Sequence, residues 1–200
     1  RLRDRQRARS VESSYEGYVT GTQKLTITAK AYGINTASDS KEYDGTPLTN
    51  KNAEVAGLVA KDTAYVEGTG EITDKGEVPN SAGDVNWASG TDERNYIHDT
   101  SLDGIGVLTV TAKKIDPTPT PTPEDPDAVE HKLTLQGLEN VTYNGSSQPQ
   151  HEKIVVKDGD KKLVEGKDYE LRWSSDTTNV GTVRVTVVGK GNYDGEDWAE

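Results

Sequence analysis

A six-residue phrase that occurs twice constrains the fold of this chain more than any other feature. Residues 108–113 read Leu-Thr-Val-Thr-Ala-Lys and residues 25–30 read Leu-Thr-Ile-Thr-Ala-Lys, so a single position differs. In both copies apolar residues alternate with Thr, which is the pattern of a strand buried on one face. The copies begin 83 residues apart, a spacing too long for a solenoid unit and suited to a small domain. The sequence therefore predicts a string of small β modules.

The composition excludes several classes of protein. The 200 residues include no Cys, so disulfides and thiolate metal sites are ruled out. The formal net charge is −11, and an acidic surface repels the phosphates of nucleic acids and anionic lipids. No apolar run approaches the roughly 18 residues of a membrane span. We therefore expect no nucleic-acid partner and no membrane insertion in this fragment.

We divide the chain into five segments. Residues 1–9 carry five Arg and one Asp and are expected to be a disordered basic start. Residues 10–30 are expected to be the end of a preceding module, and residues 31–114 a complete β module. Residues 115–128 alternate Pro and Thr before an acidic stretch, which predicts an extended, semi-rigid linker. Residues 129–200 are expected to be a second β module.

Short strands are expected in both modules, separated by Asp-Gly and Asn-Gly turns. The clearest predicted pair joins residues 168–173 to residues 182–187 as antiparallel strands. In the first module a strand begins twelve residues after Tyr96, whereas twelve residues after Tyr193 lies past the last residue. The second module is therefore expected to lack its final strand. The remaining predicted strands cover residues 25–30, 32–37, 55–58, 64–68, 84–87, 95–97, 108–113, 132–135 and 154–160.

These turn motifs resemble a known family. The first module is similar to the YDG-type and MBG-type repeats, which occur in tandem in large bacterial surface adhesins. The second module is similar to another repeat of Gram-positive surface proteins. The resemblance implies stalk-like modules of an extracellular, cell-wall-associated protein, and it defines no binding residues that could be carried over. It rests on residues 43–48, 57–58, 68–70, 95–96 and 108–111, and on residues 143–145, 149, 166–169, 179–181 and 189–193.

No group of residues in the sequence predicts a catalytic, cofactor or metal site. The three histidines (His98, His131 and His151) show no ligand spacing. The glycine motifs at residues 68–70 and 189–191 are not phosphate loops, because no helix follows them. The acidic turns at residues 124–127 and 158–160 do not match a twelve-residue calcium loop. Trp87 and Trp173 are expected in the cores and Trp198 in the tail, and Lys30 and Lys113 are weak candidates for an isopeptide amine.

The favoured interpretation is a non-catalytic, all-β chain of tandem immunoglobulin-like sandwiches, with β-grasp modules as the alternative fold. The modules would act as stalk repeats of a bacterial surface adhesin that present a distal binding head, as monomeric beads in a longer chain. An alternative function is a carbohydrate- or mucin-binding module, with host or environmental glycans or glycoproteins as partners. A further alternative is an accessory region of a surface glycan-degrading enzyme. The ligand itself is unknown at this stage.

Overall fold

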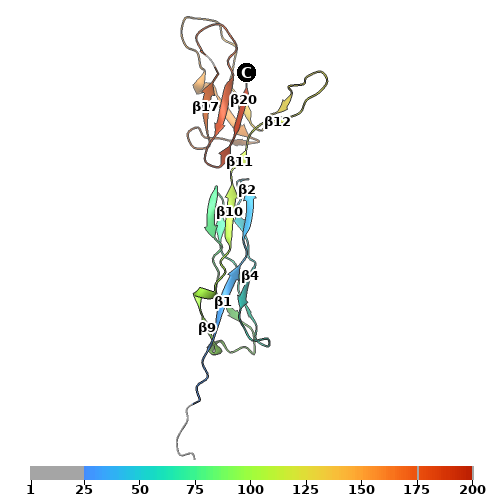
Figure 1. The fold of residues 1–200 in the computed structure, drawn as a ribbon. Coiled ribbons are helices and arrows are strands. Elements are labelled where there is room, and N and C mark those ends of the chain that lie inside the picture. Colours follow the sequence, from blue (N-terminus) through green and yellow to red (C-terminus); the bar gives the residue numbers. More distant parts are fainter. Residues whose placement is uncertain (1–24, 175, 200) are drawn as a thin grey trace, which may run out of the picture.

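The computed structural model describes residues 25–174 and 176–199 and shows an all-β chain (Figure 1). Its strands are short and form two- and three-stranded sheets. This confirms the predicted all-β class. The β-grasp alternative needs a helix across a sheet, and the only helical elements in the described ranges are three-residue 3-10 turns. These are η2 (Glu93–Asn95), η3 (Thr100–Leu102) and η4 (His151–Lys153).

The first module spans residues 30–112. Its two three-stranded sheets have the orders β4-β1-β9 and β2-β10-β7, and β3-β6 and β5-β8 form two-stranded pairs. Its ten strands are β1 (Lys30–Thr36), β2 (Asp39–Glu42), β3 (Leu48–Thr49), β4 (Ala53–Ala56), β5 (Ala64–Tyr65), β6 (Glu71–Ile72), β7 (Gly76–Pro79), β8 (Asn86–Trp87), β9 (Tyr96–His98) and β10 (Val107–Thr111).

Strand β10 contains the second copy of the repeated phrase and lies in the middle of its sheet. It pairs parallel with β2 on one side and antiparallel with β7 on the other. Leu108 and Val110 are 0% and 1% exposed and belong to the hydrophobic core. The alternation of apolar residues and Thr therefore predicted this strand and its buried face correctly.

The first copy of the phrase behaves differently, which corrects the prediction of a strand over residues 25–30. Residues 25–29 have no secondary structure and lead away from the module, and only Lys30 belongs to β1. Leu25 and Ile27 are 87% and 89% exposed. A strand needs a neighbouring strand for its backbone hydrogen bonds, and the described residues place none beside this segment. The rest of the expected preceding module, residues 10–24, and the basic residues 1–9 lie outside the described residues.

The second module spans residues 113–199. Its three-stranded sheets have the orders β14-β15-β16 and β17-β18-β20, and β11-β19 and β12-β13 are two-stranded. The predicted antiparallel pair is present as β17 and β18, but the second strand covers Val185–Gly189 and not the predicted residues 182–187. Its ten strands are β11 (Lys113–Lys114), β12 (Thr118–Pro119), β13 (Val129–Glu130), β14 (Thr134–Gln136), β15 (Val155–Asp158), β16 (Lys161–Lys162), β17 (Tyr169–Trp173), β18 (Val185–Gly189), β19 (Tyr193–Asp194) and β20 (Glu196–Ala199).

Strand β20 was not predicted from the sequence. It pairs antiparallel with β18 and places Trp198 opposite Thr186. Trp198 is therefore part of a sheet and half-buried, which corrects the expectation that it lies in a tail. The sequence reasoning failed here because two acidic residues begin the strand and break the apolar alternation.

The two modules begin in the same way. Lys30 in β1 pairs with Tyr96 in β9, and Lys113 in β11 pairs with Tyr193 in β19, both in parallel register. Strand β1 continues and pairs with β4, whereas in the second module the corresponding pairing is made by β14 with β15. Strands β11 and β14 thus correspond to the two halves of β1.

The Pro/Thr segment interrupts that first strand of the second module. Strands β12 and β13 pair antiparallel, and the hairpin that they form projects sideways from the chain (Figure 1). The segment therefore does not hold two modules apart, which corrects the prediction of a linker over residues 115–128. Alternating Pro excludes a central strand, but it does not distinguish a linker from a protruding hairpin. Ile115, at the start of the segment, is completely buried.

Candidate functional site

The modules lie end to end (Figure 1), and an amide side chain bonds them at the junction. Asn192 is 8% exposed. Its Nδ2 donates to Asp74 Oδ1 at 2.7 Å, and its Oδ1 accepts from the backbone N–H of Lys75 at 2.7 Å. Asp74 and Lys75 lie in the turn between β6 and β7 of the first module. Both hydrogen-bonding ends of one buried amide are thus used across the junction.

Two tyrosines and a lysine make a second contact at the junction. The rings of Tyr43 and Tyr193 pack edge to face, with centroids 5.7 Å apart. Lys161 Nζ lies 4.9 Å from the Tyr43 ring centroid and donates to its hydroxyl at 2.8 Å. This hydrogen bond raises the pKa of Lys161, and burial raises the pKa of Tyr193. The Lys161 amine thus lies over both tyrosine rings, a favourable cation–π arrangement.

The strand that enters the second module is held by ion pairs. Lys113 Nζ lies 2.7 and 2.6 Å from the two carboxylate oxygens of Asp158. Lys114 pairs with Asp194, and this hydrogen-bonded contact raises the pKa of Lys114 and lowers the pKa of Asp194. Asp158, in the acidic turn that was considered as a calcium site, therefore forms an ion pair with Lys113. The isopeptide candidate Lys113 faces a carboxylate in the geometry of an ion pair.

A groove of about 790 Å³ lies on the first module and contains aromatic side chains. Tyr32 stacks on His98 with ring centroids 5.1 Å apart, and Trp87 meets Tyr32 edge to face at 5.4 Å. Trp87 also stacks at 5.3 Å on Tyr96, which is buried. Trp87 is half-buried, so it supports the core and still lines the groove.

A hydrogen-bonded pair, His98 and Asp103, also lines this groove. His98 Nε2 lies 2.8 Å from Asp103 Oδ1, and the same oxygen accepts from the backbone N–H of Ile34 at 2.7 Å. The hydrogen bond from His98 and then that from Ile34 lower the pKa of Asp103. The carboxylate therefore fixes β1 and also places a polar edge beside the aromatic rings.

The three histidines each contact a different carboxylate. Besides the pair in the groove, His131 Nδ1 lies 2.5 Å from Asp197 and His151 Nε2 lies 2.9 Å from Glu165. Asp197 is completely buried and also accepts three backbone N–H groups, those of residues 132, 133 and 198. Within residues 25–174 and 176–199, no three His, Asp or Glu side chains group as a metal site.

The remaining tryptophans lie in the second module. Trp173 is half-buried, and its Nε1 donates to the Pro149 carbonyl at 3.3 Å. The ring of Trp198 meets His131 edge to face at 5.5 Å, and the guanidinium of Arg184 lies 5.0 Å from its centroid. Both rings therefore pack against loops as well as against their strands.

Asn80 is a structural residue that the sequence did not reveal. It is completely buried, donates to the carbonyls of Ala37 and Asn50, and accepts from the N–H of Gly70. A Cβ on Gly68 would lie 2.3 Å from the Asn50 carbonyl oxygen, so only glycine allows this approach. The Gly-Thr-Gly motif therefore encloses a buried amide. An Asn after a Pro-containing strand gives no sequence signal for such a role.

The chain has no match among protein-family models, curated proteins or solved structures. Among the described residues, no helix has the length and apolar character needed to cross a membrane. The class that can be stated is thus an all-β chain of small sheets.

Proposed function

We propose that these modules are non-catalytic stalk repeats of a bacterial cell-surface adhesin, extracellular and associated with the cell wall, that hold a distal binding head away from the wall. The observation that carries the proposal is the bonded junction. A single residue, Ala112, separates β10 from β11, so the closing strand of one module leads directly into the opening strand of the next. The resemblance to tandem surface repeats supports the cellular setting.

The contacts around the connecting strand favour a stiff junction. The amide of Asn192 and the ring pair of Tyr43 and Tyr193 cross the junction, and the ion pair of Lys113 with Asp158 fixes the strand that leaves it. Bending would open at least one of these contacts, and each neutral hydrogen bond contributes about 1 kcal/mol. A stalk needs this resistance, because a flexible chain of beads does not keep its end at a fixed distance.

The stiffness can be measured by electron spin resonance, because the chain has no Cys of its own. We would place spin labels at exposed positions of the two modules with Ser89→Cys and Lys162→Cys. The proposal predicts a single narrow distribution of distances between the labels. A distribution as broad as that of a flexible linker would contradict it.

A second candidate function is carbohydrate binding, and the groove of the first module favours it. Half-exposed aromatic rings with a carboxylate beside them suit a sugar, whose C–H face stacks on rings and whose hydroxyls donate to carboxylates. On a glycan array, Trp87→Ala would abolish binding, and Tyr65→Ala would not. Tyr65 is 65% exposed and is not one of the groove residues. If the wild-type chain shows no saturable binding, carbohydrate binding is contradicted and the stalk function is the remaining candidate.

A further inference from the structure

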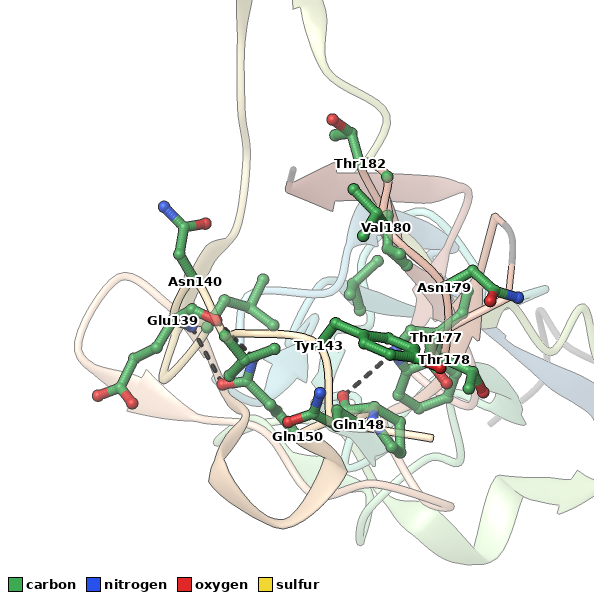
Figure 2. A pocket seen from close by; sticks show the side chains of 17 residues that line it. Glu139, Asn140, Tyr143, Gln148, Gln150, Thr177, Thr178, Asn179, Val180 and Thr182 are labelled. Carbon is green, nitrogen blue, oxygen red and sulfur yellow. Dashed lines mark hydrogen bonds between the residues drawn. The ribbon is translucent and has the colours of Figure 1, made fainter. Parts of the chain in front are cut away.

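A cavity of about 490 Å³ opens in the second module between residues 138–150 and residues 177–185. Glu139 and Asn140 lie on one side of it, and Val180 and Thr182 lie on the other (Figure 2). Val180 is 92% exposed, and Val141 and Tyr143 are 50% and 59% exposed. The cavity therefore has walls of mixed polar and apolar residues, and no described residue covers the apolar side chains of Val141, Tyr143 and Val180. We call it the strand slot.

The first module shows what fills the corresponding place there. Residues 139–142 precede the turn Tyr143-Asn144-Gly145, as β2 precedes the turn Tyr43-Asp44-Gly45. Gly45 and Gly145 have φ values of 81° and 80°. In both turns the first side chain after Tyr accepts from a backbone N–H two residues later, at 2.8 and 2.9 Å. The two turns are therefore built alike, and residues 139–142 correspond to β2.

Strand β2 is paired, whereas residues 139–142 are not in any strand. In the first module β10 lies against β2 and buries Leu108 and Val110. Tyr43, next to β2, is 8% exposed, and its counterpart Tyr143 is 59% exposed. The other wall of the slot, formed by residues before β18, corresponds to β7 of the first module. Strand β7 pairs with β10 on the side opposite β2 and precedes β8 in the chain, as this wall precedes β18. The slot thus has the position that a strand like β10 would occupy.

A segment with the sequence of β10 lies elsewhere in the chain, and no described strand pairs with it. Residues 25–28 read Leu-Thr-Ile-Thr, and their two apolar side chains are almost fully exposed. They lead into Lys30, whose pairing with Tyr96 matches that of Lys113 with Tyr193. The first module therefore follows residues 25–28 as the second module follows β10. If residues 25–28 of one copy filled the slot of another copy, the first module of the copy that supplies them would follow the second module of the other copy, as the second module follows the first within one chain.

We propose that the strand slot accepts residues 25–28 of a second copy of this chain, so that copies join head to tail. The inserted strand lies parallel to residues 139–142, with Leu25 opposite Glu139 and Ile27 opposite Val141, following the register of β10 with β2. This is strand addition to an open sheet edge, with alternate side chains entering pockets. Residues 25–28 and the slot lie at opposite ends of the molecule (Figure 1), which favours contact between copies and makes an open, non-closing assembly.

The register can be tested with a cysteine pair, since the chain contains no Cys. Thr26→Cys combined with Asn140→Cys places both thiols at directly opposed positions of the proposed strand pair. Mild oxidation should give a ladder of covalent dimers and larger species on a non-reducing gel. The control is Thr26→Cys with Ser40→Cys, because Ser40 is the counterpart of Asn140 and already pairs with Thr109.

A peptide measures the affinity of the slot directly. The probe is a synthetic peptide of residues 24–31, with a scrambled peptide of the same composition as its control. It should bind saturably and prevent the ladder, and replacing its Ile with Asp should weaken binding at least about tenfold, as expected for losing a buried apolar side chain. Ile27→Asp in the chain should make it monomeric in sedimentation, and that monomer should still bind the peptide.

Three results would overturn the proposal. Equal ladders from the Asn140 and Ser40 variants would show that the link is not specific to the slot. A disulfide confined to single chains would show that the same copy fills the slot. A peptide that fails to bind both the wild-type chain and the monomeric variant would show that the slot is not a strand acceptor. None of these outcomes bears on the stalk function, which depends on the junction.

Discussion

Replacing Asn192 with Asp is the sharpest test of the junction, because it keeps the size of the side chain and removes its donor. The oxygen that replaces Nδ2 would face Asp74 Oδ1, now 2.7 Å away. Two full charges at that distance would repel by roughly 6 kcal/mol at an effective dielectric constant of about 20. Asp74 is exposed, however, and can turn into water. The lost hydrogen bond to a charged group therefore sets the cost, at about 2 kcal/mol.

Urea unfolding followed by tryptophan fluorescence measures this change. With a typical slope for a small protein, a loss of about 2 kcal/mol lowers the midpoint by roughly 1 M. The spin-label distances across the junction should also broaden. The matched control is Asn95→Asp, because Asn95 occupies the same place before Tyr96 in the first module and is exposed. We expect that variant to unfold within about 0.5 kcal/mol of the wild type.

The pH dependence separates charge repulsion from a packing defect. A neighbouring carboxylate raises the pKa of the introduced carboxyl above its usual value of about 3.9. As the pH falls from 7 to 4 the introduced group therefore gains a proton, can again donate to Asp74, and the deficit relative to wild type shrinks. A deficit that is the same at both pH values, or an equal deficit in the Asn95→Asp control, would refute the reasoning.

Three further predictions concern the first module. Asn80→Ala should destabilise it by about 2 to 4 kcal/mol, because buried backbone groups lose their partners. The control, Asn86→Ala at an exposed position, should change the free energy of unfolding little. Equal effects of the two variants in urea unfolding would contradict this prediction. Burial raises the pKa of Tyr96, so its contribution to stability is complete below about pH 10 and is lost as the pH rises through its higher folded value; Tyr96→Phe should reduce the alkaline loss in thermal unfolding scans. Hydrogen bonds from His98 and Ile34 lower the pKa of Asp103, so its contribution is complete above about pH 4 and is lost as the pH falls through the lower folded value. Asp103→Asn should flatten the acid limb, and an unchanged limb would show that these two hydrogen bonds add no stability.

The strands that sequence reasoning predicted well are those whose burial follows a simple period. Strands β10, β17 and β18 alternate apolar and polar residues, and the structure pairs all three within three-stranded sheets. Period-two patterns report one-sided burial, so they identify a strand without identifying its partners.

The strands that were missed have no such period. Strand β7 reads Gly-Glu-Val-Pro and β20 begins with two acidic residues. Both are defined by a neighbour, since β7 lies against β10 and β20 against β18. A partner distant in sequence leaves no local pattern, and turn or acidic residues at strand positions then point away from a strand.

Residues 25–30 show the converse failure. Their pattern equals that of β10, yet residues 25–29 form no strand because no edge lies beside them among the described residues. The junction was also missed, because Asn192 lies in a turn and Asp158 and Lys161 lie at the ends of short strands, where polar residues are ordinary in sequence. Only the fold brings them to the end of the first module.

The side hairpin made by β12 and β13 also has a practical consequence. Its two ends are fixed, one by the buried Ile115 and the other by the pairing of β14 with β15, so the turn between them carries no load along the molecular axis. Foreign peptides, affinity tags or fluorophores spliced into residues 121–127 would stand clear of both modules, and the length of the rod would not change.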